Sequence, residues 1–157
     1  MTASAASLGP VGHIAYVVDD VRAAMALHAA GGTRWSDVRR PAAVLRLPHG
    51  EVVETSVDYV AASGGEPRLK LLSRTPGTVF DGPPGDHVHH LSYWVDELDA
   101  PTAGLAAAGW RVEADGLADD GTVGYRYLVS PGGMRIELGL EANRAAFDEW
   151  ADGARPA

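Results

Sequence analysis

Hydrophobic and polar positions follow the same order in two separate stretches of the chain. The earlier stretch reads GHIAYVVDDVRAAMALHAAGGTRW, and the later one reads HHLSYWVDELDAPTAGLAAAGWRV. Aligned without gaps, they place His13 on His90, with the same apolar alternation and a following aspartate in both. A second match places RLKLL, from Arg68, on RIELG, from Arg135. Two matching blocks in the same order predict an internal duplication, in which each half forms one structural module.

Each half predicts the element order βαβββ. An alternating run rich in β-formers, such as HIAYVV from His13, is typical of a strand, and Asp20 is placed to cap the helix that follows. Turns with Gly and Pro then separate three further strands. One domain of 157 residues is expected, with module one at about 10–74, a Pro- and Gly-rich linker at about 75–86 and module two at about 87–140. The expected strands are 13–18, 43–47, 52–61, 68–73, 90–95, 110–114, 125–129 and 134–140, and the expected helices are 21–30, 98–108 and, at the C-terminus, about 141–151.

Strand alternation sorts the side chains of each module into two faces. One face is apolar in all four matched strands and is expected to pack under the helices. The opposite face carries His13, Arg68, Lys70, His90, Arg135 and Glu137. Two histidines and one glutamate suffice to bind a divalent metal, since imidazole suits Zn, Fe, Ni and Co and a carboxylate adds compensating charge. We interpret His13, His90 and Glu137 as candidate metal ligands, against the alternative of a merely solvated face.

Composition narrows the classes of function. The chain has no cysteine, which excludes disulfide scaffolds, cysteine-ligated metals and thiol nucleophiles and fits a reducing compartment. Its net charge of −8 disfavours general binding to nucleic acid and to anionic membranes. No apolar run approaches the ~20 residues that span a bilayer, and the N-terminal segment MTASAASLGP lacks the features of a secretory signal. We expect a cytoplasmic protein whose partner is a small molecule.

Four motifs, taken in order, resemble the vicinal oxygen chelate superfamily, also called the glyoxalase/bleomycin-resistance/dioxygenase family. They are GHIAYVVDD, HHLSYWVDEL, AGLAAAGW and GYRYLVSPGGMRIELG, and the resemblance covers about residues 10–140. It implies an α+β fold in which two βαβββ modules form a cup-shaped mixed sheet around a divalent metal (Zn, Fe, Ni, Co or Mn), with a short C-terminal helix added here. It also implies a homodimer. Family ligands come from the first and last strands of each module, at positions that match His13, Lys70, His90 and Glu137.

Lys70 departs from the pattern of the isomerase branch of this family. That branch, which includes glyoxalase I and methylmalonyl-CoA epimerase, usually has Glu or Gln at the matching position. A protonated lysine has no lone pair and cannot ligate a metal. A nearby dication could lower the pKa of Lys70 and make it a base. Alternatively, Lys70 holds an anionic substrate or the carboxylate of Glu137, or it is a surface residue without a role.

The remaining candidate residues concern the substrate. Tyr125 and Tyr127 share a face and could orient a substrate oxygen. Strict alternation puts His89 on the face away from the metal. Arg68 and Arg135 could bind an anionic group, and Trp94 could form the floor of an aromatic pocket.

Three functions remain open from the sequence. The first is a metal-dependent isomerase or lyase that stabilises an enolate or oxyanion. The second is an Fe(II) extradiol-type dioxygenase with a two-His one-Glu triad. The third is a metal-free protein that binds or sequesters a small molecule.

Overall fold

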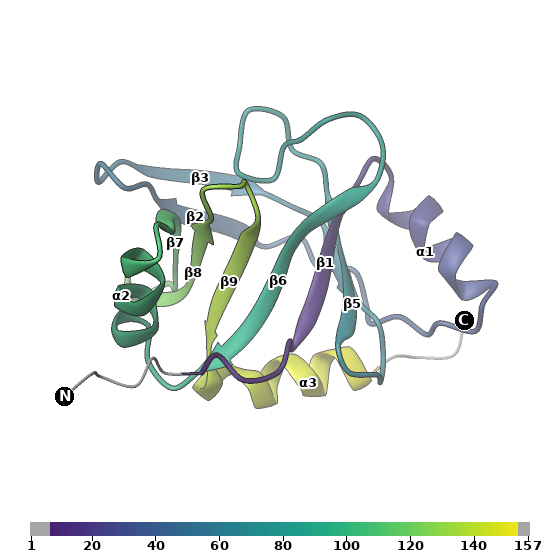
Figure 1. Cartoon of the computed structure of the whole chain (residues 1–157). Coiled ribbons are helices and arrows are strands. Elements are labelled where there is room, and N and C mark those ends of the chain that lie inside the picture. The colour runs from purple at the N-terminus through teal and green to yellow at the C-terminus, as the bar shows by residue number, and fades with distance from the viewer. Residues whose placement is uncertain (1–6, 154–157) are drawn as a thin grey trace.

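Within the described residues, 7–153, nine strands form one curled mixed sheet and three α-helices pack around it in the computed structural model (Figure 1). The α+β fold predicted from the sequence is confirmed, whereas residues 1–6 of the segment considered for a secretory signal lie outside the described part. Every helix in residues 7–153 is too short or too polar to cross a membrane. The elements are β1 (His13–Val18), α1 (Val21–Ala29), β2 (Ala42–Arg46), β3 (Val52–Ser56), β4 (Tyr59–Ala61), β5 (Arg68–Ser73), β6 (His87–Val95), α2 (Asp99–Ala107), β7 (Arg111–Leu117), β8 (Val123–Val129), β9 (Arg135–Leu140), a 3₁₀ turn (Glu141–Asn143) and α3 (Arg144–Asp152).

The strand register repeats between the two halves. The strands follow the order β3-β2-β7-β8-β9-β6-β1-β5-β4, so that β1 and β6 lie side by side and antiparallel at the centre. In the first half, Ala15 of β1 pairs with Lys70 of parallel strand β5. In the second half, Ser92 of β6 pairs with Glu137 of parallel strand β9. These pairs coincide under the two sequence matches, so Lys70 and Glu137 occupy equivalent positions in the two halves.

The halves differ at the strand expected over 52–61. The structure divides it into β3 and β4, because the chain turns at Val57 and Asp58. Val57 is buried in the interior, the Asp58 amide donates to Ser73 Oγ at 2.9 Å, and the Asp58 carboxylate accepts from Arg40 at 2.9 Å. The hairpin of β2 and β3 therefore leaves its own half and pairs with β7 of the other, while β4 stays on β5.

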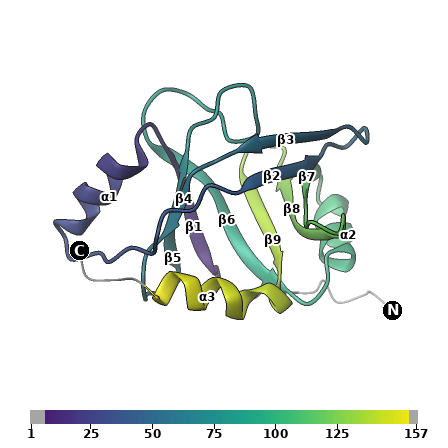
Figure 2. The same cartoon turned by 180° about the vertical axis from the view of Figure 1, so that it is seen from behind.

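Helices α1 and α2 cover the outer, apolar face of the sheet, as the alternation predicts. Asp20 caps α1 by accepting from the Ala23 amide at 3.0 Å, and α1 packs on Val18 and Leu71. The second half places α2 on an apolar cluster that includes Ile136. Figures 1 and 2 show these helices at opposite ends of the sheet.

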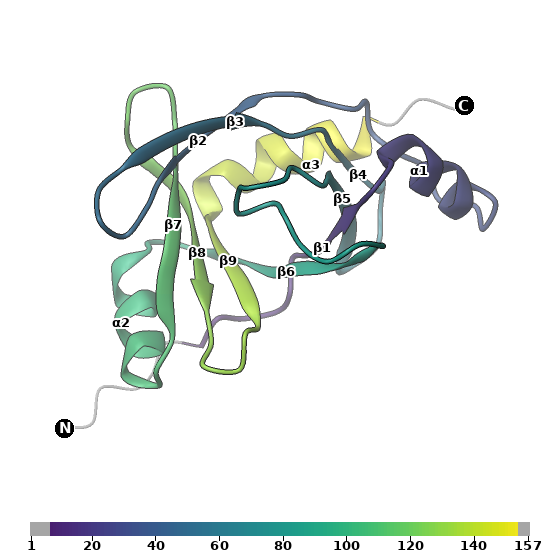
Figure 3. The ribbon, with the colours of Figure 1, turned by 90° about the horizontal axis from the view of Figure 1, so that it is seen from above.

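The C-terminal helix α3 lies within the curve of the sheet. Figure 3 shows it between the β2–β3 hairpin and the central strands, where it closes one end of the cup. Arg68 of β5 fastens α3 by donating to Asp152 at 2.7 and 2.8 Å and to Asp148 at 3.1 Å. This helix therefore brings side chains of the chain's last segment to the central strands.

Candidate metal centre

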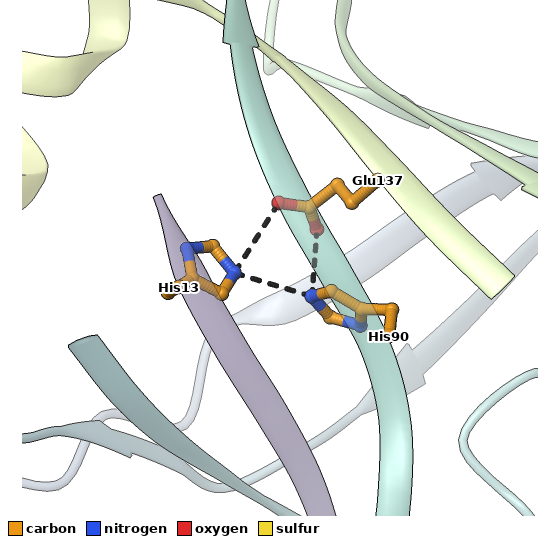
Figure 4. Close-up of side chains that lie close together, drawn as sticks. All are labelled: His13, His90 and Glu137. Atoms are coloured by element: carbon orange, nitrogen blue, oxygen red, sulfur yellow. Dashed lines mark hydrogen bonds and ion pairs between the residues drawn. The ribbon is translucent and has the colours of Figure 1, made fainter. Parts of the chain in front are cut away.

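Three buried side chains converge at the centre of the sheet. His13 begins β1, His90 lies in β6 and Glu137 lies in β9, and their relative exposures are 1%, 0% and 7%. The Nε2 atoms of the two histidines are 3.2 Å apart (Figure 4). Glu137 presents Oε1 to His13 and Oε2 to His90, each at 3.6 Å from the Nε2 atom. The structure thus brings together the three residues that the sequence predicts as ligands.

This geometry fits a divalent metal. Bonds of about 2.1 Å from a metal to nitrogen or oxygen place neighbouring ligand atoms about 3.0–3.4 Å apart at octahedral or tetrahedral angles. The measured separations of 3.2 and 3.6 Å are close to that range. The donor set of two imidazoles and one carboxylate is one that Zn and non-heme Fe(II) accept, and it leaves coordination positions for a substrate or water. His13, His90 and Glu137 could therefore hold a metal ion.

Both histidines are neutral near pH 7, the charge state in which a ring nitrogen can bind a metal. Burial first, and then the charge of Lys70, lowers the pKa of His13 well below its usual value, against the opposing effect of Glu137. Burial also lowers the pKa of His90 well below the usual value, with His89 and Lys70 adding to the shift. Neutral imidazole is the form that binds a metal.

Glu137 is ionised although it is buried. Burial alone raises the pKa of a carboxyl group, but Lys70, His13 and hydrogen bonds from Ser92 and Tyr127 outweigh it, so the pKa of Glu137 is lowered. The Ser92 hydroxyl donates to Oε1 at 3.0 Å. A fixed anionic oxygen at this position compensates the charge of a dication.

A cavity of about 350 Å³ adjoins the triad. It is lined by His13 and Glu137 and by aromatic rings, among them Tyr59, Phe80 and Phe147. Phe147 of α3 stacks on the ring of His13, with centroids 5.4 Å apart. Among the described residues that line the cavity, Lys70 is the only lysine or arginine, and its Nζ lies 5.0 Å from the centroid of Tyr59 and 5.9 Å from that of Phe147. A substrate in this cavity would meet a cation, an anion and aromatic faces.

The other predicted site residues divide into two groups. Trp94, Tyr125 and Tyr127 line the cavity. Arg68 and Arg135 do not line it, because their guanidinium groups bind carboxylates elsewhere. Arg68 contacts α3, as described above, and Arg135 donates to Glu113 of β7 at 2.6 and 2.7 Å. The two arginines support the walls of the cup, and their predicted contact with the substrate gains no support from these positions.

His89 lies on the inner side of the sheet, contrary to strict alternation. A bulge in β6 causes this, since Ala15 pairs with His90 and the next residue of β1 pairs with Val88, which leaves His89 as the extra residue. The His89 side chain is buried against Phe80 and His90. Its Nδ1 atom lies 2.8 Å from Nδ1 of His90. Nothing in the sequence HVHHLS marks the position of this bulge.

Tyr125 owes its place in the cavity to a glycine on the neighbouring strand. Gly116 pairs with Tyr125, and a Cβ atom built at Gly116 would lie 2.0 Å from Cζ of the tyrosine ring. We expect Gly116→Ala to displace this ring and to lower the free energy of unfolding by about 1–3 kcal/mol, the usual cost of overpacking. Gly124→Ala is the matched control, because its nearest neighbour would be 3.8 Å away. Equal urea midpoints for the two variants would contradict the prediction.

The comparisons with known proteins agree with this fold. Residues 12–128 match the family described as the Glyoxalase/Bleomycin resistance protein/Dioxygenase superfamily. Among solved structures, 2,2',3-trihydroxybiphenyl 1,2-dioxygenase from the dibenzofuran-degrading Sphingomonas wittichii strain RW1 is similar, with 21% identity, a TM-score of 0.50 and coverage of 83% of this chain and 41% of that one. BphC, a halotolerant catechol dioxygenase, has 21% identity and a TM-score of 0.50, over 83% of this chain and 39% of its own.

These likenesses concern the fold alone, and the chain spans about two fifths of the length of those two enzymes. No curated protein matches the sequence. The family match, by contrast, covers most of the chain, including β1, β5 and β6. The chain therefore belongs to the glyoxalase/bleomycin resistance protein/dioxygenase superfamily.

Proposed function

We propose that this protein is a metal-dependent enzyme that binds a small oxygenated organic substrate in the cavity beside His13, His90 and Glu137. The convergence of three buried ligand atoms beside a cavity that His13 and Glu137 line is the observation that carries the proposal. A bound divalent metal would supply a Lewis acid that stabilises negative charge on substrate oxygens. The rings of Phe147 and Tyr59 form apolar walls of the same cavity.

The first reaction class that we propose is isomerisation or elimination. It requires a group that moves a proton at the substrate, and Lys70 is the candidate because it lines the same cavity as His13 and Glu137. Burial, followed by the charge of Glu137, raises the pKa of both Tyr125 and Tyr127. These phenols therefore stay neutral, and the Tyr125 hydroxyl can orient a substrate oxygen by hydrogen bonding.

Ring cleavage by an Fe(II) oxygenase is the second candidate, favoured by the donor set. Two histidines and one carboxylate are the ligands of non-heme Fe(II) oxygenases. Because Lys70 occupies the fourth ligand position of the family, the donor set has three ligands. In this candidate Lys70 attracts the anionic form of an aromatic diol rather than moving a proton.

One set of measurements separates these functions. Metal-free protein is titrated with Zn²⁺, Ni²⁺, Mn²⁺ and, without oxygen, Fe²⁺, and the reconstituted protein is assayed for oxygen uptake with catechols and for solvent deuterium exchange into 2-oxo and 2-hydroxy acids. Deuterium exchange without oxygen uptake supports the isomerase or lyase candidate, and oxygen uptake with Fe²⁺ supports the oxygenase. Failure to bind any of these metals would overturn the proposal in favour of a metal-free binding protein.

We expect Lys70→Glu to bind divalent metals more tightly than the wild type, by at least about tenfold. A charged lysine repels a dication, whereas a glutamate attracts it and adds a fourth ligand at the position equivalent to Glu137. At an effective dielectric constant near 20, two unit charges about 4 Å apart interact by about 4 kcal/mol, whereas a tenfold change in affinity needs only about 1.4 kcal/mol. Calorimetric titration with Zn²⁺ or Mn²⁺ measures the difference.

Lys70→Met separates the two contributions, because it removes the charge without adding a ligand. Its metal affinity should lie between those of the wild type and Lys70→Glu. Both variants should lose the native activity if Lys70 moves a proton or holds an anionic group. Equal affinities in all three proteins would show that the charge of Lys70 does not act on the metal centre.

A further inference from the structure

His89 contacts the edge of the His90 ring that lies opposite to His13 and Glu137. His89 Nδ1 is 2.8 Å from His90 Nδ1, and His89 Nε2 is 2.8 Å from the carbonyl oxygen of Val79. On the other edge of the same ring, Nε2 of His90 faces His13 and Glu137. A single chain of contacts thus joins the Val79 carbonyl, through two imidazole rings, to the candidate metal position.

The hydrogen-bonding capacities of these groups fix the proton positions. A carbonyl oxygen can only accept, so His89 Nε2 carries a proton and donates it to Val79. His89 is 3% exposed and packs against the rings of Phe80 and Tyr127, and a charge buried among apolar rings is costly, so the imidazole is neutral. The neutral ring then has a bare Nδ1, which can only accept. Because the two Nδ1 atoms are at hydrogen-bond distance, His90 Nδ1 must carry the proton between them.

We propose that His89 is a positioning residue that holds His90 in the Nδ1–H tautomer, so that Nε2 of His90 presents its lone pair toward His13 and Glu137. A metal-ligating histidine usually donates its other ring N–H to a carboxylate, a carbonyl or water. Here a second imidazole takes that place, and the Val79 carbonyl sets its orientation in turn. The tautomer follows from contacts within the chain, and its use for metal binding rests on the function proposed above.

The surroundings of His89 hold its ring in place. Phe80 stacks on it with centroids 5.6 Å apart and an interplanar angle of 27°. Tyr127 meets the same ring edge-to-face at 5.6 Å. The bulge in β6 is what allows two consecutive histidines to share the inner side, since regular alternation would send one of them outward. The bulge in β6, the stacked ring of Phe80 and the carbonyl of Val79 therefore all fix the orientation of the His89 side chain.

The tautomers can be read directly in metal-free wild-type protein. Long-range ¹H–¹⁵N correlation spectra distinguish a protonated from a bare ring nitrogen, and histidine substitutions assign the signals. We expect protonated Nδ1 and bare Nε2 in His90, and the reverse in His89. The opposite tautomer in either ring, or a charged His89 at pH 7, would overturn the inference without any variant being made.

Two substitutions of similar size test the consequence for metal binding. His89→Asn keeps an oxygen acceptor at the place of Nδ1, whereas His89→Leu removes it. We expect the Leu variant to bind Zn²⁺ about 10–100-fold more weakly, as for other groups that orient metal ligands, and to populate both tautomers of His90. The Asn variant should restore the Nδ1–H tautomer and most of the affinity.

The outcomes distinguish this inference from the proposed function. Unchanged affinity in the Leu variant, or equal losses in the Leu and Asn variants, would show that the acceptor does not matter and would overturn the positioning role. If the wild type shows both expected tautomers but binds no metal, the proposed function fails while the hydrogen-bond chain stands.

Discussion

Metal-free protein will lose most of its stability between pH 7 and pH 5. Burial is the first cause of a lowered pKa in His13, His89 and His90, and the pKa of His89 falls to about 4. Below the unfolded-state pKa of about 6.5, the unfolded chain binds protons at these histidines and the folded chain does not. Unfolding therefore takes up protons, and the free energy of unfolding falls as the pH falls.

The expected size of this effect is large. Each histidine that stays neutral in the fold contributes a loss of about 2 kcal/mol between pH 7 and pH 5, so three contribute about 6 kcal/mol. That is comparable with the whole stability of an ordinary domain. Buried and ion-paired carboxylates with lowered pKa values lose their contribution only below about pH 4.5, outside this window.

Urea unfolding with a chelator present, at intervals between pH 7 and pH 5, measures the change. His89→Asn removes one of the three titrating rings and should reduce the loss by about a third. A free energy of unfolding that stays constant over this range would mean that the histidines are protonated in the fold as readily as in the unfolded chain.

Glu137→Gln is expected to weaken divalent metal binding by more than about 100-fold. Loss of a group that only orients a ligand costs 10–100-fold in affinity, and Glu137 supplies both a ligand atom and the charge that compensates a dication. The substitution preserves the size of the side chain, so it changes the charge more than the packing. Calorimetric titration with Zn²⁺ should show the loss.

A matched carboxylate outside the cavity serves as the control. Glu113 is ion-paired with Arg135 on the wall of the cup, so Glu113→Gln should leave metal affinity within about twofold of the wild type because its charge is screened by its partner and by solvent. If the two glutamine variants bind metal equally well, Glu137 is not a ligand.

The duplication allowed much of the site to be predicted from the sequence. Alternation and the two matched blocks are local properties of β1, β5, β6 and β9, and these strands keep a regular register next to the triad. The contact of His13 with His90 and Glu137 also depends on the antiparallel pairing of β1 with β6 at the centre of the sheet. The roles of these residues as ligands remain predictions that the titrations test.

The features that escaped prediction depend on contacts between distant segments. The bulge that turns His89 inward shifts alternation by one residue, and only the pairing of β6 with β1 reveals it. The β2–β3 hairpin pairs across the halves because of the turn at Asp58. Alternation placed Arg68 on a face but could not show that α3 would supply its carboxylate partners. The helix itself was expected, whereas the stacking of Phe147 on His13 depends on where the helix packs.

Lys70 and Glu137 occupy equivalent positions in two modules of one chain, and only such a fusion allows the two positions to hold different residues. In an assembly of two identical single-module chains, symmetry would force the same residue onto both positions, and a lysine could be gained only by losing both carboxylates. Joining the modules in one chain removes that constraint, because each position can then mutate alone. Here one half carries a cation and the other an anion, so the cavity has an electrical polarity that an assembly of two identical modules could not have.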